Sequence, residues 1–226
     1  MKLSIRPAIR RFLSDFFDRF FAGSLKIQLR IKAQQEAADY IYKYLSDKPY
    51  IESSSHNCEI LSIGLNAVTI EGLYMELGVW KGGTINHIAK TATIVYGFDS
   101  FEGLPGYWTP QYKDGFFKLK QIPKVRDNVI LTKGWFKDTL PGFVRTHKAN
   151  IAFVHLDADM YLSTKTFFDV CGHMITNGTV IVFNEYFGFP FWQENEHKAF
   201  QEWLTESGMK YEYLCYGDSM VAVKIK

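Results

Sequence analysis

Short apolar runs, separated by longer polar segments, dominate the chain from residue 73 onwards. Five of these runs end in a polar residue or a glycine: LYMELG (73–78), TIVYGFDS (93–100), NVILTKG (128–134), IAFVHLD (151–157) and GTVIVFNE (178–185). Runs of this length are typical of buried strands, and the segments between them are long enough for helices or loops. This alternation predicts an α/β fold whose Rossmann-like sheet is mostly parallel and covered on both faces.

Two further apolar runs follow near the C-terminus. KYEYLCYG (210–217) and SMVAVKIK (219–226) are joined through Gly217 and Asp218, which is the signal of a tight hairpin. We therefore expect an antiparallel hairpin to close the otherwise parallel sheet.

Residues 1–56 differ in pattern and predict a helical extension, with the main domain at 57–226. Phenylalanines recur at three- and four-residue spacing between Phe12 and Phe21, which predicts an amphipathic helix, and a second helix is expected at about 28–47. We interpret the first helix as packed on the domain or on a partner subunit of a homo-oligomer. The alternative is peripheral contact with a membrane, because the basic residues beside this aromatic face suit anionic lipid.

The composition narrows the class of protein. A chain of 226 residues with 47% hydrophobic residues is expected to be globular, and its net charge of +2 gives no case for a nucleic-acid partner. The three cysteines, Cys58, Cys171 and Cys215, form no metal or disulfide pattern, which fits a reducing compartment. The sequence shows neither a bilayer-spanning apolar run nor a secretion signal, so we expect a cytoplasmic protein.

The ends of the predicted strands carry the candidate chemistry, because ligands of open α/β sheets bind at the carboxyl ends of the strands. The residues at these ends are polar, acidic or glycine: Glu76, Gly78, Asp99, Ser100, Gly134, Trp135, Asp157, Asp159, Asn184 and Glu185. This concentration is the main indication of a site.

A glycine-rich turn, ELGVWKGGT (76–84), follows the first of these strands. Gly78 permits a tight turn, Gly82 and Gly83 would let the backbone approach a ligand, and Thr84 could cap the next helix. The spacing matches neither the dinucleotide nor the phosphate-binding glycine motif, so nicotinamide cofactors and ATP are disfavoured. The alternative is a turn that binds no ligand.

Two residues could contact a nucleoside. Asp99 follows Glu76 by 23 positions, where an acidic side chain of a Rossmann-like sheet can accept both hydroxyls of a ribose. Trp135, just past Gly134, could stack on a flat heterocycle such as adenine. A turn cap for Asp99 and core packing for Trp135 are the alternatives.

The acidic residues after the last two parallel strands suggest a metal. Asp157, Asn184 and Glu185 offer hard oxygen ligands, which suit Mg²⁺ or a similar divalent cation. Asp159, held outside the metal shell, could serve as a general base, or it could simply cap the following helix. We interpret His155 as a core histidine.

Two loops could contact a substrate. The segment from DSFEGLPGYW (99–108) to about residue 127 is typical of a lid or binding loop, or alternatively of a surface insertion. EYFGFPFW (185–192) could close over a substrate ring or pack on the sheet.

Several of these segments together resemble the macrocin O-methyltransferase family: YMELGVWKGGT, YGFDSFEGLPGYW, GWFKDTLP, FVHLDADMYLST and VIVFNEY. The resemblance covers about residues 70–205. It implies a class I methyltransferase fold with seven strands and an enzyme that uses S-adenosylmethionine to methylate hydroxyl groups, chiefly on sugars of antibiotics and related glycosides.

The resemblance also implies roles for individual residues. Glu76, Gly78, Gly82, Gly83 and Thr84 would form the methionine-binding turn, Asp99 with its neighbour Ser100 would hold the ribose, and Gly134, Trp135 and Phe136 would line the adenine pocket. Asp157 would border the cofactor and bind the metal together with Asn184 and Glu185, and Asp159 would be the general base. Asn184-Glu185 departs from the Asp-Asp pair usual in metal-dependent members, which predicts weaker metal binding or its loss.

These observations predict an S-adenosylmethionine-dependent O-methyltransferase, assisted by Mg²⁺, that acts on a sugar or another polyhydroxylated natural product. Two alternatives stay open. One is a nicotinamide-dependent oxidoreductase, and the other is a catalytically inactive methyltransferase-like scaffold that binds a partner or a membrane.

Overall fold

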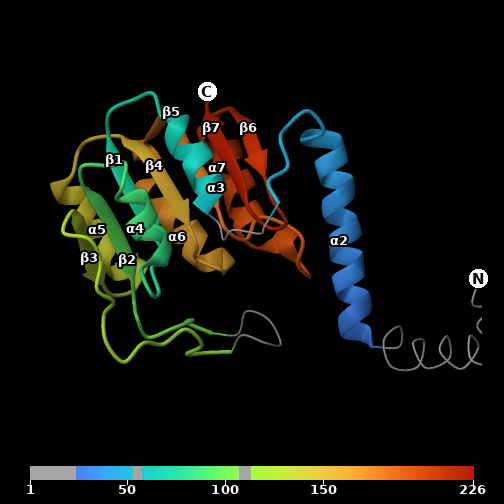
Figure 1. Ribbon diagram of the computed structural model, residues 1–226, viewed down its shortest axis with the longest axis horizontal. Helices are drawn as coiled ribbons and strands as arrows, with labels where there is room; N and C mark the ends of the chain where they lie inside the picture. The colour runs from blue at the N-terminus through green and yellow to red at the C-terminus, as the bar shows by residue number, and fades with distance from the viewer. Residues whose placement is uncertain (1–23, 53–57, 107–112) are drawn as a thin grey trace, which may run out of the picture.

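A computed structural model of the chain describes residues 24–52, 58–106 and 113–226 (Figure 1). The predicted amphipathic helix around Phe12–Phe21 lies outside the described residues. None of the described helices is long and apolar enough to cross a membrane.

A seven-stranded sheet with the order β3-β2-β1-β4-β5-β7-β6 forms the centre of the fold. Its strands are β1 (Leu73–Leu77), β2 (Val95–Asp99), β3 (Val129–Lys133), β4 (Ile151–Leu156), β5 (Ile175–Phe183), β6 (Tyr211–Tyr216) and β7 (Val221–Ile225). The first five pair in parallel, whereas β7 pairs antiparallel with both β5 and β6. The predicted parallel sheet with its terminal antiparallel hairpin is therefore confirmed.

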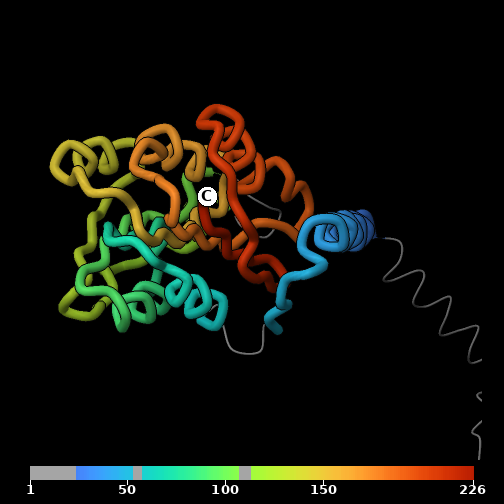
Figure 2. The backbone as a smooth tube through the Cα atoms, turned by 90° about the horizontal axis from the view of Figure 1, so that it is seen from above, coloured from blue at the N-terminus to red at the C-terminus, as the bar shows by residue number. Residues whose placement is uncertain are grey.

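Helices cover both faces of the sheet, as the view from above shows (Figure 2). One layer holds α3 (Cys58–Asn66) and α4 (Gly83–Ile88); the other holds α5 (Phe136–Thr146), α6 (Tyr161–Cys171) and α7 (Glu196–Ser207), with the short 3₁₀ helices η3 (Gly172–Met174) and η4 (Trp192–Glu194) beside them.

Each face of the sheet has its own apolar core, because successive strand residues point to opposite faces. In β5, Val180 and Val182 pack into the core under α3 and α4, whereas Ile181 and Phe183 pack into the core under the other helices. Burial on both faces explains why the strand sequences are continuous apolar runs.

A long helix, α2 (Leu25–Tyr44), stands at the β6 side of the sheet (Figure 1). The sequence predicts this helix at about 28–47, so both of its predicted ends lie a few residues C-terminal to the observed ones. Its buried residues are Ala33 and Ala37, and the Tyr40 hydroxyl lies 2.6 Å from the Tyr213 hydroxyl of β6. The division into an extension at 1–56 and a domain at 57–226 stays a prediction.

The strand order creates the crevice in which a ligand can bind. After β1 the chain adds β2 and then β3 on one side, and then crosses to add β4 and β5 on the other side. The carboxyl ends of β1 and β4 therefore flank the point at which the strand order reverses.

Candidate functional site

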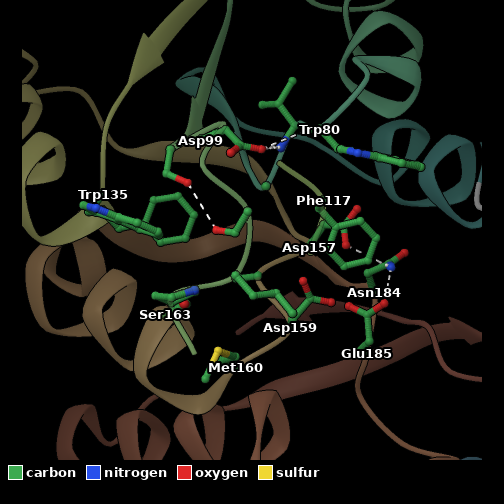
Figure 3. Close-up of a pocket in the computed structure, with 18 of the residues that line it drawn as sticks. Trp80, Asp99, Phe117, Trp135, Asp157, Asp159, Met160, Ser163, Asn184 and Glu185 are labelled. Carbon is green, nitrogen blue, oxygen red and sulfur yellow. Dashed lines mark hydrogen bonds between the residues drawn. The ribbon is translucent and has the colours of Figure 1, made fainter. Parts of the chain in front are cut away.

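A cavity of about 880 Å³ opens at the carboxyl ends of the parallel strands (Figure 3). The loops that follow each of the five parallel strands contribute to its lining. Most of the predicted site residues border it: Gly78, Gly83, Thr84, Asp99, Ser100, Gly134, Trp135, Phe136, Asp157, Asp159, Asn184 and Glu185. The volume lies in the range typical of small-molecule sites.

A glycine is required at position 78 because the backbone of the loop after β4 lies directly against it. Its φ is +88°, and a Cβ at this position would lie 1.8 Å from the carbonyl oxygen of Asp157. The turn after β1 and the loop after β4 therefore meet at a glycine, which brings the two halves of the site together.

Two other residues of the same turn have different outcomes. Gly82 is not among the residues that line the cavity; it has a φ of +80° at the N-cap of α4, a Cβ there would meet the Val125 side chain at 3.0 Å, and its approach to a ligand stays a prediction. Thr84 lies inside α4, so it does not cap the helix, although it does border the cavity.

Asp99 holds the glycine-rich turn in place. One carboxylate oxygen accepts hydrogen bonds from the backbone N–H groups of Val79 (2.9 Å) and Trp80 (2.8 Å). The other accepts one from the N–H of Phe101, at 2.6 Å. A carboxylate offers about four acceptor positions, so capacity for a ligand hydroxyl remains.

Aromatic side chains form much of the remaining wall. Trp135 and Phe136 border the cavity at the start of α5, and their contact with a flat heterocycle stays a prediction. Trp80 and Phe117 meet edge to face with their ring centroids 5.4 Å apart. Both have a positive φ, which is strained for a residue with a side chain.

Glu76 lies beneath the cavity and not in its wall. Its Oε1 accepts a 2.7 Å hydrogen bond from Nδ1 of His155, and both side chains are fully buried. Burial raises the pKa of Glu76, against the effect of this hydrogen bond. Burial alone would lower the pKa of His155, but the hydrogen bond and charge of Glu76 raise it. His155 is thus a core residue, as expected, and its bond to Glu76 joins β4 to β1.

Three carboxylates gather at the ends of β4 and β5. Asp157, Asp159 and Glu185 each have an oxygen within 4.8 Å of the others. Asp159 thus lies within this group, whereas the expectation kept it outside the metal shell. It does not cap α6 either, because the N-cap of that helix is Met160.

The pKa values of these carboxyl groups are raised. Burial is the main cause for each, and it raises the pKa of Asp157 to about 6. Neighbouring carboxylates add to the effect: Glu76 and Asp99 at Asp157, and Asp157 at both Asp159 and Glu185. Without a cation, the negative charge on one carboxylate disfavours ionisation of its neighbours.

The side chain of Asn184 lies between two of these carboxylates. Its amide nitrogen donates hydrogen bonds to Asp157 (3.1 Å) and to Glu185 (2.5 Å). Asn184 thus supplies two donors where an aspartate would add another charge. Its expected role as a metal ligand stays a prediction.

A divalent cation fits this donor set. Oε2 of Glu185 is buried and has no hydrogen-bond partner among the described residues. A buried carboxylate oxygen without a partner is unfavourable, and a cation held between Asp157 and Glu185 would satisfy it.

The aromatic segment after β5 does not cover the cavity. Tyr186, Phe187 and Trp192 are buried in the core beside α7 and α2, so of the two expected roles for EYFGFPFW the structure shows packing on the sheet. The sequence pattern also gave no sign of Glu196, a fully buried carboxylate that contacts the backbone of the acidic loops.

Comparison with known proteins identifies the family. The sequence profile of the family described as macrocin-O-methyltransferase (TylF) matches residues 63–211, which is more than half of the chain. The chain belongs to this family.

One curated relative is a sugar methyltransferase. It is the 8-demethyl-8-(2,3-dimethoxy-alpha-L-rhamnosyl)-tetracenomycin-C 4'-O-methyltransferase of Streptomyces olivaceus, 28% identical over 143 residues, or 52% of this chain and 54% of the relative. The chain therefore spans about half the length of this curated family relative.

Solved structures agree on the fold of this macrocin-O-methyltransferase family member. The calicheamicin methyltransferase CalS11 superposes with a TM-score of 0.62 at 18% identity, covering 98% of this chain and 94% of that one. The O-methyltransferase NovP gives 0.57 at 19% identity, covering 74% and 79%. The fold is thus that of class I methyltransferases.

Proposed function

We propose that this protein transfers a methyl group from S-adenosylmethionine to a hydroxyl group of a sugar or of another polyhydroxylated natural product. The observation that carries this proposal is a single cavity in which the residues expected to hold the cofactor face a cluster of converging carboxylates. Membership of the macrocin-O-methyltransferase family supports the reaction class.

The cofactor would lie along the wall formed by the loops after β1, β2 and β3. Asp99 has acceptor capacity left for a ribose hydroxyl, and the rings of Trp135 and Phe136 offer flat surfaces to the adenine. When bound, S-adenosylmethionine supplies a methyl group on a sulfonium. The chain's part is to align the acceptor hydroxyl with that group.

Asp159 is the residue that we assign as general base. It borders the cavity, and its raised pKa brings the carboxylate closer to the pH at which proton removal is efficient. In this role it would take the proton of the acceptor hydroxyl as the carbon–oxygen bond forms and the bond between the methyl carbon and sulfur breaks, which leaves S-adenosylhomocysteine.

Asp157 and Glu185 would hold a Mg²⁺ ion, with Asp159 beside them. The ion would orient the acceptor hydroxyl and lower its pKa. The MycE methyltransferase of mycinamycin biosynthesis, solved in complex with Mg and SAH, has a comparable fold (TM-score 0.50, 11% identity, 83% of this chain and 53% of that one). That neighbour supports testing Mg²⁺ before other cations.

The activities of similar proteins favour a glycosidic acceptor. The curated relative acts on a rhamnosyl tetracenomycin, and a second CalS11 structure carries the description TDP-rhamnose 3'-O-methyltransferase. We therefore propose a sugar hydroxyl as the site of methylation.

We also propose that the enzyme is cytoplasmic. Its three free cysteines fit a reducing compartment.

Isothermal titration with S-adenosylhomocysteine tests the cofactor assignment. We expect saturable binding to the wild type, and at least a tenfold loss of affinity in Asp99→Ala, about 1.4 kcal/mol. Asp127→Ala, which removes an exposed carboxylate before β3, is the matched control and should bind like the wild type.

The acceptor is tested by radiolabelled methyl transfer from S-adenosylmethionine to a panel of glycosides and nucleotide-linked sugars, with Mg²⁺ or with EDTA. Transfer that depends on Asp159 would support the assignment of the base. If the wild type binds no S-adenosylhomocysteine in either buffer, the proposal is wrong and the inactive scaffold becomes the better account.

A further inference from the structure

Glu196, the first residue of α7, reaches back to the two loops that carry the acidic cluster. Its side chain is fully buried. Oε1 accepts a hydrogen bond from the N–H of Ala158 at 3.4 Å, and Oε2 accepts one from the N–H of Glu185 at 3.1 Å. One carboxylate thus joins the loop after β4 to the loop after β5.

These two amides lie just beyond the end of the sheet. The ladder between β4 and β5 ends where the N–H of Asn184 donates to the carbonyl of Leu156, at 2.9 Å. The amides of Ala158 and Glu185 come after this last ladder bond, and Glu196 supplies their acceptors. Buried N–H groups need such partners, so the carboxylate continues the pairing of the two strands where the backbone no longer can.

The loop on one side of this link is strained. Asp159 has a φ of +58°, and the N–H of Met160 donates to the carbonyl of Ala158 at 2.6 Å, closing a three-residue turn around Asp159. Turns of this kind with a positive central φ are rare and costly. They persist only when the surrounding structure holds them, and Glu196 bonds to the residue immediately before Asp159.

Burying a carboxylate at this position is energetically unfavourable, which argues against a role in packing alone. Burial raises the pKa of Glu196 well above its usual value, and the nearby Asp157 and Asp159 raise it further, although the two backbone hydrogen bonds oppose this. An apolar side chain of similar size would avoid that cost but would leave both amides without an acceptor.

We propose that Glu196 is a positioning residue that holds Asp159 and Glu185 in one geometry by bonding to the backbone of both acidic loops. Its importance for catalysis rests on the proposed function, but the mechanical link does not. Glu196 has no place in the wall of the cavity, so it acts through the residues that it holds.

The variants Glu196→Gln and Glu196→Ala, made in the full chain, separate the two bonds. Glutamine has one oxygen acceptor, so it can keep one of the two amide bonds, whereas alanine keeps neither. Glu194→Gln, two residues earlier and exposed beside Lys198, is the matched control.

Hydrogen exchange of single amides, followed by NMR, is the deciding measurement. We expect exchange at either Ala158 or Glu185 to rise at least tenfold in Glu196→Gln, and at both in Glu196→Ala, relative to core amides of β4. The affinity for Mn²⁺, used alone as a probe, should fall at least tenfold in Glu196→Ala, while the affinity for S-adenosylhomocysteine stays within twofold.

Unchanged exchange at both amides in Glu196→Gln would overturn the inference, even if the melting temperature falls. If Glu196→Ala does not fold, the exchange pattern of Glu196→Gln decides. Failure of the wild type to bind S-adenosylhomocysteine would count against the proposed function only, because the amide exchange reports on Glu196 without any ligand.

Discussion

At the scale of single residues, the glycines of the turn after β1 show that the same residue type serves different needs. Gly78 has a positive φ and faces the carbonyl oxygen of Asp157, so a side chain there would meet backbone atoms of another strand's loop. A Cβ at Gly83 would meet no atom within 4 Å apart from its chain neighbours and the backbone of its own helix. The sequence motif alone does not distinguish the two.

Alanine substitution at these two positions should therefore give opposite results. Gly78→Ala should lower the free energy of unfolding by at least about 3 kcal/mol, because the turn and the loop after β4 must move apart. Gly83→Ala should change it by less than about 1 kcal/mol, since the residue lies in a helix and has space. Urea denaturation measures both, and a cost for Gly78→Ala no larger than that for Gly83→Ala would contradict the close approach.

At the scale of elements, the start of α7 connects the site to α2. Glu196 faces the acidic loops, whereas the next residue, His197, packs edge to face against Tyr40 of α2 at 5.3 Å and against Trp192 at 5.0 Å. Nε2 of His197 is buried without a partner among the described residues, and burial lowers the pKa of this side chain to about 4. The imidazole is therefore neutral in the folded protein near neutral pH.

This histidine should make the fold less stable in acid. In the unfolded chain it takes up a proton near pH 6.5, but in the folded protein only near pH 4, so stability is present above pH 6.5 and is lost as the pH falls through that window. The wild type should lose free energy of unfolding on the order of 2 kcal/mol between pH 7 and pH 4 because of this histidine, and His197→Phe should not show that loss.

Denaturation of His197→Phe at a series of pH values measures this effect, with His173→Phe as the control at an exposed position. An acid slope equal to that of the wild type would show that His197 is already protonated, or freely solvated, in the folded state.

At the scale of the whole molecule, the net charge is close to zero although several carboxyl groups gather in one place. The chain has a net charge of +2, yet burial raises the pKa values of Asp157, Asp159, Glu185 and Glu196 at one end of the sheet, and the charge of Asp157 raises those of the other three further. Such a cluster stabilises the fold less as its members lose protons, and more when a cation binds.

A rise in pH without metal should therefore lower the free energy of unfolding, and addition of a divalent cation should raise it. Because the pKa of Asp157 is raised from 3.8 to about 6, its contribution without metal is present below about pH 4 and is lost as the pH rises through 6. Asp157→Asn, melted in EDTA, should gain stability relative to the wild type between pH 4 and pH 7, by an amount on the order of 2 kcal/mol.

In the presence of Mg²⁺ at pH 8, the wild type should instead be more stable than Asp157→Asn. At ten to a hundred times its dissociation constant, a ligand stabilises the folded protein by about 1.4 to 2.7 kcal/mol, and Asp157→Asn should lose most of this gain. Asp127→Asn, which changes an exposed aspartate, is the control. A wild-type melting temperature that does not respond to Mg²⁺ at pH 8 would remove the metal from the proposed function.

The sequence by itself determined the strands, the terminal hairpin and a set of site residues most of which border the cavity. These follow from local rules: apolar runs form strands, and the polar or glycine residues that end parallel strands must meet at one edge of the sheet. Asp99, Trp135 and Asp157 were found in this way.

Only the tertiary structure decided how these residues contact one another. Glu196 bonds to Ala158 across 38 positions, His155 bonds to Glu76 across 79, and Gly78 meets the carbonyl of Asp157. It also buried the aromatic segment 186–192 and turned the amide nitrogen of Asn184 toward two carboxylates. Packing between distant segments sets such contacts, and no periodicity along the chain encodes which segments will meet.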